Sequence, residues 1–376
     1  MLTSLRIQNF RSIRDASVKL GQVNLFIGPN NSGKSNFLKG IELVARVAQA
    51  YPAGYSPKVP LEFISQLPRS ISDYSVLTKE YIRFSVGFSE NKLLSFGTSL
   101  EKPIQIFTPQ FTLPTLADFS DFNYNSTSEE APYKDFKELK HLLIGTGIYH
   151  TVLSSINFTS NILRDRKLAY NGANIISFLF NLIQDNRKKF KELEDDFAHC
   201  VTGLVFIETP LNPDVDQPGT FKLRFSDQDG AKYWAEEVSD GVLYFLALLC
   251  IVHQPDPPKL LLLEEPEKGI HPRRIREVMD FIFELARMRD IQIILTSHSP
   301  YVVDHFKDIP ECISVFDREN GETVIRNAKD IMDAKNAELR AVGEEPIHFS
   351  DGLGEYWVSG FLGGVPDVLG TEARPA

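Results

Sequence analysis

Residues 28–35 constrain this chain more than any other segment. They read Gly-Pro-Asn-Asn-Ser-Gly-Lys-Ser and match the phosphate-binding pattern GxxxxGK[ST] in full. The apolar run 23–27 before them predicts a buried strand, and apolar residues at helical spacing predict a helix over 36–50. A strand, a loop and a helix in this order direct backbone N–H groups at a phosphate. We therefore expect the chain to bind a nucleotide.

The side chains of this loop have separate predicted roles. Lys34 is expected to reach the β- and γ-phosphates, and the Ser35 hydroxyl is expected to coordinate Mg²⁺. The alternative, a turn rich in Gly and Ser that only enters a helix, does not require the complete pattern. The other positions expected to contact the nucleotide are Gly28, Asn30, Asn31, Ser32, Gly33 and Asn36.

Composition narrows the class of protein. A length of 376 residues allows two or three structural units, and 43% apolar with 24% charged residues is typical of a soluble globular chain. The apolar stretch 242–252 is about half of a membrane span, and the N-terminus lacks the features of a signal peptide. Cys200, Cys250 and Cys312 are far apart, which indicates free thiols and no metal site. We expect a cytoplasmic protein.

The net charge of −10 argues against a DNA-binding surface that covers the whole molecule. Basic clusters occur at 164–167, 187–191 and 273–276, each interleaved with acids or placed on a predicted helix face. Solvated helix surfaces explain these clusters more simply than DNA contacts do, although local DNA contact stays open.

The order of predicted elements indicates an α/β protein. The opening residues 5–10 and 16–20 alternate like a β-hairpin, residues 80–112 are rich in strand formers, 113–134 are polar and turn-rich, and helical periodicity runs over 175–200. Helices and strands then alternate, which predicts a parallel sheet. These elements are a helix at 241–253, strand at 259–263, helix at 272–289, strand at 291–296, helix at 300–306 and strand at 311–316.

Carboxylates follow one of these strands. Four leucines at 260–263 predict a central parallel strand, and Glu264, Glu265 and Glu267 come at its carboxyl end, where open α/β sheets place their ligands. Glu264 is expected to hold Mg²⁺ through its water shell, and Glu265 to orient and polarise the attacking water. The alternative is a strand that runs into an acidic loop, and the complete phosphate loop makes it less economical.

Two further segments carry polar groups suited to phosphate. The next strand ends at His298, which we expect to donate to the γ-phosphate, although a lone histidine is more commonly structural. Ser239, Asp240 and Gly241 open a helix rich in Leu and Phe. They could serve only as an N-cap, but a capped helix start can also bind an anion.

Together the segments 28–35, 239–241, 264–272 and 296–300 resemble the motifs of ABC-type ATPase heads, in the order of that family. The chain looks closest to the RecF/SMC-like branch and to the ATPase part of OLD-family proteins, and the opening LRIQNFRSI is similar as well. The resemblance covers roughly residues 1–50 and 200–320. It implies an ABC-type P-loop ATPase head with a mixed or parallel central sheet, an N-terminal antiparallel β-subdomain and a helical and β insertion.

The resemblance also implies a division of the chain and a set of partners. A single ATPase unit over 1–376 would have an N-terminal lobe at 1–51, an insertion at 52–200, a second lobe at 201–320 and a partner-facing tail at 321–376. Two chains would enclose two ATP molecules with Mg²⁺ in a head-to-tail homodimer, or in a higher even oligomer. Lys34, Glu265 and His298 would be the catalytic residues, Ser239, Asp240 and Gly241 would contact the γ-phosphate on the other protomer, and Glu267 and His271 would line the interface.

The sequence departs from the family pattern at three points. Glu264 stands where many relatives carry Asp, and Asp240 stands where transporters carry Gly. The glutamine of the family's Q-loop is unassigned, because Gln105 and Gln110 are only weak candidates.

OLD-like proteins append a TOPRIM nuclease after the ATPase. The short tail here carries Asp351, Glu355 and Asp367, which we interpret as surface charge, so we expect no nuclease within this chain. Residues 352–366 are apolar and glycine-rich, which predicts a packed or partner-facing end.

These observations support more than one function. The first hypothesis is an ATP-hydrolysing switch, in which residues 52–200 transmit dimer closure to DNA or to a separate effector protein, in DNA maintenance or anti-phage defence. The second is a nucleotide-dependent binding scaffold with little or no turnover. A transporter motor is a weaker third, because the signature fits it poorly and no membrane partner is expected.

Overall fold

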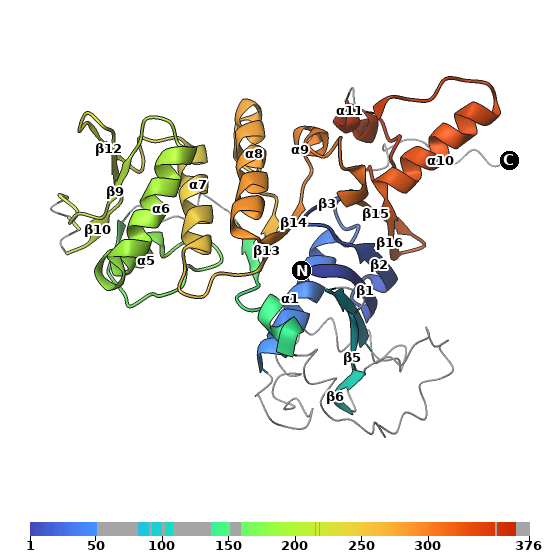
Figure 1. The fold of residues 1–376 in the computed structure, drawn as a ribbon, viewed down its shortest axis with the longest axis horizontal. Helices are drawn as coiled ribbons and strands as arrows, with labels where there is room; N and C mark the ends of the chain where they lie inside the picture. Colours follow the sequence, from blue (N-terminus) through green and yellow to red (C-terminus); the bar gives the residue numbers. More distant parts are fainter. Residues whose placement is uncertain are drawn as a thin grey trace.

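The computed structural model describes most of the chain (Figure 1). The described residues are 1–50, 82–89, 92–99, 102–107, 137–150, 159–214, 216–217, 219–349 and 352–365. The predicted loop at 113–134 and the residues Gln110, Asp351 and Asp367 lie outside them, as does much of the expected insertion at 52–200.

A mostly parallel sheet forms the core of the described residues. Its strand order is β16 (Glu322–Asn327), β15 (Ile313–Glu319), β3 (Val23–Ile27), β14 (Gln292–Thr296), β13 (Leu260–Glu264) and β7 (Ile148–His150). Neighbouring strands are parallel except for the antiparallel pair of β15 and β16. Every residue of β3 and β14 is buried, because helices or a second sheet cover both faces. The predicted α/β class with a mixed central sheet is confirmed.

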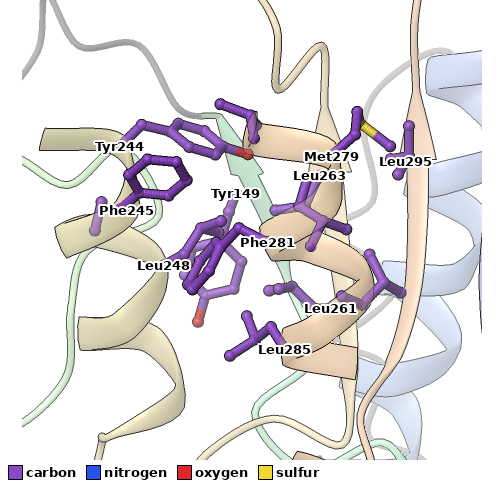
Figure 2. Packing of buried hydrophobic residues seen from close by; sticks show 14 of the residues in the cluster. Tyr149, Tyr244, Phe245, Leu248, Leu261, Leu263, Met279, Phe281, Leu285 and Leu295 are labelled. Atoms are coloured by element: carbon purple, nitrogen blue, oxygen red, sulfur yellow. The ribbon is translucent and has the colours of Figure 1, made fainter. Parts of the chain in front are cut away.

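Helices cover the two faces of this sheet. Helix α1 (Lys34–Ala50) packs with Phe26, Leu262 and Ile294 on one face. Helices α7 (Asp240–Val252), α8 (Pro272–Arg289) and α9 (Pro300–Asp304) contribute to the hydrophobic core on the other face. Figure 2 shows Phe245 of α7 against Phe281 of α8, with ring centroids 5.0 Å apart. Alternate residues of each strand therefore belong to different cores, which fixes the register of the sheet.

An antiparallel sheet packs beside the core sheet, over the N-terminal part of the chain. The hairpin predicted at the start of the chain is confirmed, and its first strand also pairs with a strand from the segment 80–112, which the sequence analysis found rich in strand formers. The order of its strands is β2 (Ile13–Lys19), β1 (Leu2–Phe10), β4 (Ile82–Phe88), β5 (Lys92–Ser99) and β6 (Lys102–Phe107).

A third, helical part lies at the left end of Figure 1. The helical run predicted over 175–200 forms two helices, α5 (Ile175–Asp185) and α6 (Arg187–Cys200). The break lies at Asn186, whose side chain accepts a hydrogen bond from the Lys189 N–H and so begins a new helix. Short strands complete this part: β8 (Thr159–Ser160), β9 (Phe206–Glu208), β10 (Phe221–Lys222), β11 (Arg224–Ser226) and β12 (Lys232–Trp234).

A partly buried cluster of ionisable side chains links this helical part to the core. His253, at the end of α7, lies 2.7 Å from Asp196 of α6, and Arg289, at the end of α8, bonds to the same carboxylate. Burial lowers the pKa of His253, although Asp196 opposes the shift. The C-terminal end of α7 is therefore fixed against α6 and α8.

The C-terminal part packs on the core, as predicted for an apolar and glycine-rich segment. Helix α10 (Ala328–Ala341) follows β16, and α11 (Leu353–Val358) packs against α9. The Gly354 N–H donates to Asp304 at 2.7 Å, and a side chain at Gly354 would collide with the backbone of Pro300. Gly364 in turn lies against Phe316, beside Gly28 of the phosphate loop.

None of the helices in the described residues combines the length and apolar character that a membrane crossing needs. The three cysteines are free thiols, and no cluster of His, Cys, Asp and Glu that could hold a metal was found among the described residues.

Gln292, the first residue of β14, joins the two main sheets. Its side chain accepts a hydrogen bond from the Leu2 N–H at 2.8 Å and donates to the carbonyl oxygens of Leu2 and Gly21, both at 2.7 Å. Gln292 is buried. These backbone groups are also screened from water, so they need hydrogen-bond partners within the protein. The Gln292 side-chain amide provides these partners.

We expect Gln292→Leu to lower the free energy of unfolding by about 2 kcal/mol or more, because it leaves buried backbone groups without partners. Gln22→Leu is the matched control. Gln22 is exposed and makes one bond, to the Ala286 carbonyl oxygen, so its loss should cost about 0.5 kcal/mol. Chemical denaturation measures both variants, and equal losses would contradict the assigned role.

Candidate functional site

The carboxyl ends of three core strands meet at one edge of the sheet. Glu264 of β13 is paired with Thr296 of β14, and Thr296 is paired with Phe26 of β3. The loops that follow these strands therefore emerge side by side. This register brings the phosphate loop, the acidic segment and His298 to one place, as the sequence predicts.

The phosphate loop requires glycine at two positions. Gly28 has φ +145°, and a Cβ there would lie 2.2 Å from the Phe316 carbonyl oxygen. Gly33 has φ +109°, and its Cβ would lie 2.3 Å from Thr323 Oγ1. Both φ values belong to the region that side chains disfavour. The loop is thus shaped by β15 and β16, elements far from it in the sequence.

Lys34 spans the phosphate loop. It is 6% exposed, and its Nζ donates to the carbonyl oxygens of Gly28 at 2.7 Å and Pro29 at 2.9 Å. Burial lowers the pKa of Lys34 to about 8, against the opposing effect of Glu265 and Glu264. A buried ammonium whose hydrogen bonds go to carbonyl oxygens favours an anion nearby, and phosphate would supply one.

Ser35 and Glu264 form the part of the site that could hold a metal. The Ser35 hydroxyl donates a short hydrogen bond to Glu264 Oε1, across 229 positions of sequence. Hydroxyl and carboxylate oxygens are ligands that Mg²⁺ prefers. Ser32 adds a buried hydroxyl that has no hydrogen-bond partner among the described residues. These residues fit a magnesium-bound triphosphate.

Glu265 lies beside His298 in a strained conformation. Its φ of +47° is left-handed, which costs a non-glycine residue about 1 kcal/mol or more. Its N–H donates to the Thr296 carbonyl oxygen at 3.1 Å, and its carboxylate lies 3.6 Å from His298 Nε2 and 3.4 Å from Lys268 Nζ. The side chain is 33% exposed, so water can reach it. This geometry is the one that a residue polarising a water molecule needs.

The His298 side chain lies beside this carboxylate and is 36% exposed. Burial lowers the pKa of His298, Lys34 lowers it further, and Glu265 opposes the shift. The neutral ring is therefore favoured at neutral pH. A neutral imidazole still carries one N–H that can donate to a phosphate oxygen.

Glu267 points into its own chain. Its Oε1 accepts hydrogen bonds from the Ser297 hydroxyl at 2.5 Å and from the His298 N–H at 3.1 Å. Burial raises the pKa of Glu267, and the two hydrogen bonds oppose the shift. The expectation that Glu267 and His271 line an interface stays a prediction. His271 is exposed and begins α8, where its Nδ1 accepts from the Arg273 N–H at 3.3 Å.

The predicted signature segment lies elsewhere. Ser239 is the N-cap residue of α7, but its side chain makes no capping bond and instead accepts from Arg274 Nη1 at 2.6 Å. The N-cap position that the sequence left open for Ser239 is therefore confirmed, although its side chain makes no capping hydrogen bond. In Figure 1, α8 lies between α7 and the β3–α1 region. The structure does not bring Ser239, Asp240 and Gly241 to the phosphate loop of the same chain.

Sequence reasoning missed the residues that support the loop from outside. The Asn36 side chain, expected to contact nucleotide, donates to Ser12 Oγ at 2.9 Å and accepts from Arg11 at 3.2 Å. Ser12 Oγ lies 2.9 Å from Thr323 Oγ1, the atom that faces Gly33. The opening strand pair thus braces the loop. In the sequence, the only signal for this support was the Phe-Arg-Ser within the segment LRIQNFRSI.

The Q-loop stays unassigned. Gln105 lies on β6, the outermost strand of the antiparallel sheet, and the structure does not bring it to the site. The strand that flanks β13 is β7, which the sequence analysis did not predict, and His150 at its end is paired with Glu264.

Comparison with known proteins agrees with the fold and places the chain in a family. The family model described as "AAA domain, putative AbiEii toxin, Type IV TA system" matches residues 23–304, about three quarters of the chain. The crystal structure of the SmcHead bound to the C-winged helix domain of ScpA has the same fold. Its TM-score is 0.52 at 14% identity, over 88% of this chain and 99% of that one.

Two curated relatives are nucleases by name. The Old nuclease of Escherichia phage P2 is 22% identical over 381 aligned residues, 90% of this chain and 64% of the nuclease. The OLD nuclease of Thermus scotoductus is 35% identical over 65 residues, 17% of this chain and 12% of the nuclease. The chain spans less than two thirds of the length of either relative.

The contact between Gly33 and Thr323 can be tested. We expect Gly33→Ala to weaken nucleotide binding by about tenfold or more, because the added methyl group displaces the loop. Gly321→Ala is the control, since Gly321 also has a positive φ of +83° but no atom near its Cβ position. Calorimetric titration with ATP measures both. Equal affinities would show that Thr323 does not shape the loop.

Proposed function

We propose that this chain, which belongs to the AAA_21 family and is an ABC-type ATPase head of the RecF, SMC and OLD kind, hydrolyses ATP to ADP and phosphate and closes into a head-to-tail dimer when ATP is bound. The observation that carries the proposal is the meeting of Lys34, Ser35 with Glu264, and Glu265 with His298 at one edge of the sheet.

Each of these groups has a step in the proposed reaction. The loop N–H groups and Lys34 bind the β- and γ-phosphates, and Lys34 exchanges its carbonyl partners for phosphate oxygens. Mg²⁺, held by Ser35 and through water by Glu264, would neutralise charge on the phosphates. Glu265 accepts a hydrogen bond from the attacking water, and His298 donates to the γ-phosphate as its charge rises.

The position of the signature segment supports the proposed dimer. Ser239, Asp240 and Gly241 lie at the start of α7, away from the phosphate loop of the same chain. A two-fold, head-to-tail dimer would place this helix start against the γ-phosphate of the partner. The Arg274 guanidinium, bonded to Ser239, would offset the negative charge of Asp240 there.

The process served by this cycle is proposed from the relatives. The two relatives named as OLD nucleases support a DNA-related or antiviral role. The SmcHead structure contains a domain of a second protein, ScpA, which supports a separate effector for this chain. We propose that dimer closure regulates such an effector, in DNA maintenance or in anti-phage defence.

Glu265→Gln tests hydrolysis against the alternative of a binding scaffold. We expect phosphate release to fall by about a hundredfold or more, because the amide cannot accept the proton of the water. ATP binding should persist, and the variant should accumulate as an ATP-bound dimer in light scattering. Glu277→Gln, an exposed acid on α8, is the control. Turnover that does not change in Glu265→Gln would contradict the catalytic assignment.

Mixing two inactive variants tests whether the site is shared. Ser239→Arg spoils only the predicted contact with the partner's phosphate, and Glu265→Gln spoils only the chain's own site. A mixed dimer contains one site with both parts intact, so equal mixing should restore up to about a quarter of wild-type turnover. Absence of any recovery, with mixed dimers shown by mass spectrometry, would contradict a signature that acts in trans.

A further inference from the structure

We propose that Glu267 is a positioning residue of the ATPase site: its carboxylate fixes the loop that carries His298 and so sets the place of the imidazole ring above Glu265. The inference rests on the proposed hydrolysis of ATP. It concerns a residue whose side chain the nucleotide and the attacking water do not touch in the proposed mechanism.

One carboxylate oxygen of Glu267 anchors several groups of the loop that carries His298. Glu267 Oε1 accepts from the Ser297 hydroxyl at 2.5 Å and from the His298 N–H at 3.1 Å. Ser297 is completely buried, and its Oγ accepts in turn from the Ser299 N–H at 2.9 Å. Three consecutive residues of the loop are therefore anchored, directly or through Ser297, on one carboxylate.

Among the described residues, few polar contacts fix the position of the His298 ring. Among the described residues its recorded polar contact is with Glu265, and the 3.6 Å separation of Nε2 and Oε1 is too long for a hydrogen bond. The position of the ring is then set by the backbone that carries it. That backbone is bonded to Glu267.

Hydrogen bonds link the loop after β13, which carries Glu265, to the loop after β14, which carries His298. The Glu265 N–H donates to the Thr296 carbonyl oxygen at 3.1 Å, which ties the acidic loop to the end of β14. Glu267 makes the next tie, two residues further along the acidic loop. The two ties fix the loops against each other, so the spacing of Glu265 and His298 depends on both.

Burial of the Glu267 carboxylate is energetically unfavourable. Glu267 Oε2 is buried and has no hydrogen-bond partner among the described residues. A buried carboxylate oxygen without a donor is unfavourable, and a smaller neutral side chain could hold a loop without it. Such costs are tolerated where they serve a functional site.

The test is a double-mutant cycle between Glu267 and His298. We expect Glu267→Ala to lower kcat by about tenfold or more, within the roughly hundredfold contribution of one positioned donor, while the affinity for ATP changes by less than about twofold. His298→Ala should lower kcat as well. In the His298→Ala background, Glu267→Ala should have no further effect, because the residue that it positions is gone.

Glu267→Gln keeps an acceptor oxygen and should recover most of the kcat lost in Glu267→Ala. Losses that multiply in the double variant, or an Ala variant whose defect is in ATP affinity, would overturn the proposal. So would a Gln variant as slow as the Ala variant. If Glu267→Ala does not fold, Ser297→Ala replaces it in the same cycle, since it removes the anchor of Ser299 and one of the two bonds to Glu267.

A readout without turnover separates this proposal from the ATPase function. Burial lowers the pKa of His298, so a ring released from its loop should titrate closer to 6.5, its ordinary value. Nuclear magnetic resonance of the imidazole should show this rise in Glu267→Ala and not in Glu277→Gln. An unchanged pKa of His298 in Glu267→Ala would overturn the positioning role, whether or not the wild-type chain hydrolyses ATP.

Discussion

The in-register parallel pairing of β3, β14 and β13 is the constraint on which the site depends. Each strand is apolar on both faces and ends at the same edge, so the change from buried strand to polar loop happens three times in one place. Moving β13 by one residue would exchange the faces of its leucines and remove Glu264 from Ser35. The two cores that the alternate leucines enter thus fix the position of the metal-binding carboxylate.

The sequence predicted those parts of the structure that depend on local pattern. The phosphate loop was recognisable from its fixed motif, the strand at 260–264 from four leucines followed by acids, and the helix at 272–289 from its apolar periodicity. His298 was placed correctly at the end of a strand. The alternation of predicted helices and strands along the chain then indicated the α/β fold class.

What could not be predicted depends on contacts between distant segments. The strand Ile148–His150 has three residues, too few to show a period, and it exists because β13 offers it a partner. Thr323 shapes the phosphate loop from a different strand, and Arg274 takes the hydroxyl of Ser239 from its own helix. The break at Asn186 was missed because an asparagine is tolerated in a helix and only its cap with Lys189 reveals the boundary.

Glu267 links the turn predicted to face the partner chain to the proposed site of hydrolysis. It belongs to the turn after β13 that is predicted to face the partner chain, yet its carboxylate holds the backbone of His298. A partner that displaced this turn would move His298 relative to Glu265, since both depend on the same pair of loops. Closure of the dimer could then act on hydrolysis through the chain's own residues, before the signature of the partner touches the phosphate. Gly364 lies close to the phosphate loop as well, since a Cβ at Gly364 would lie 3.4 Å from Gly28 Cα.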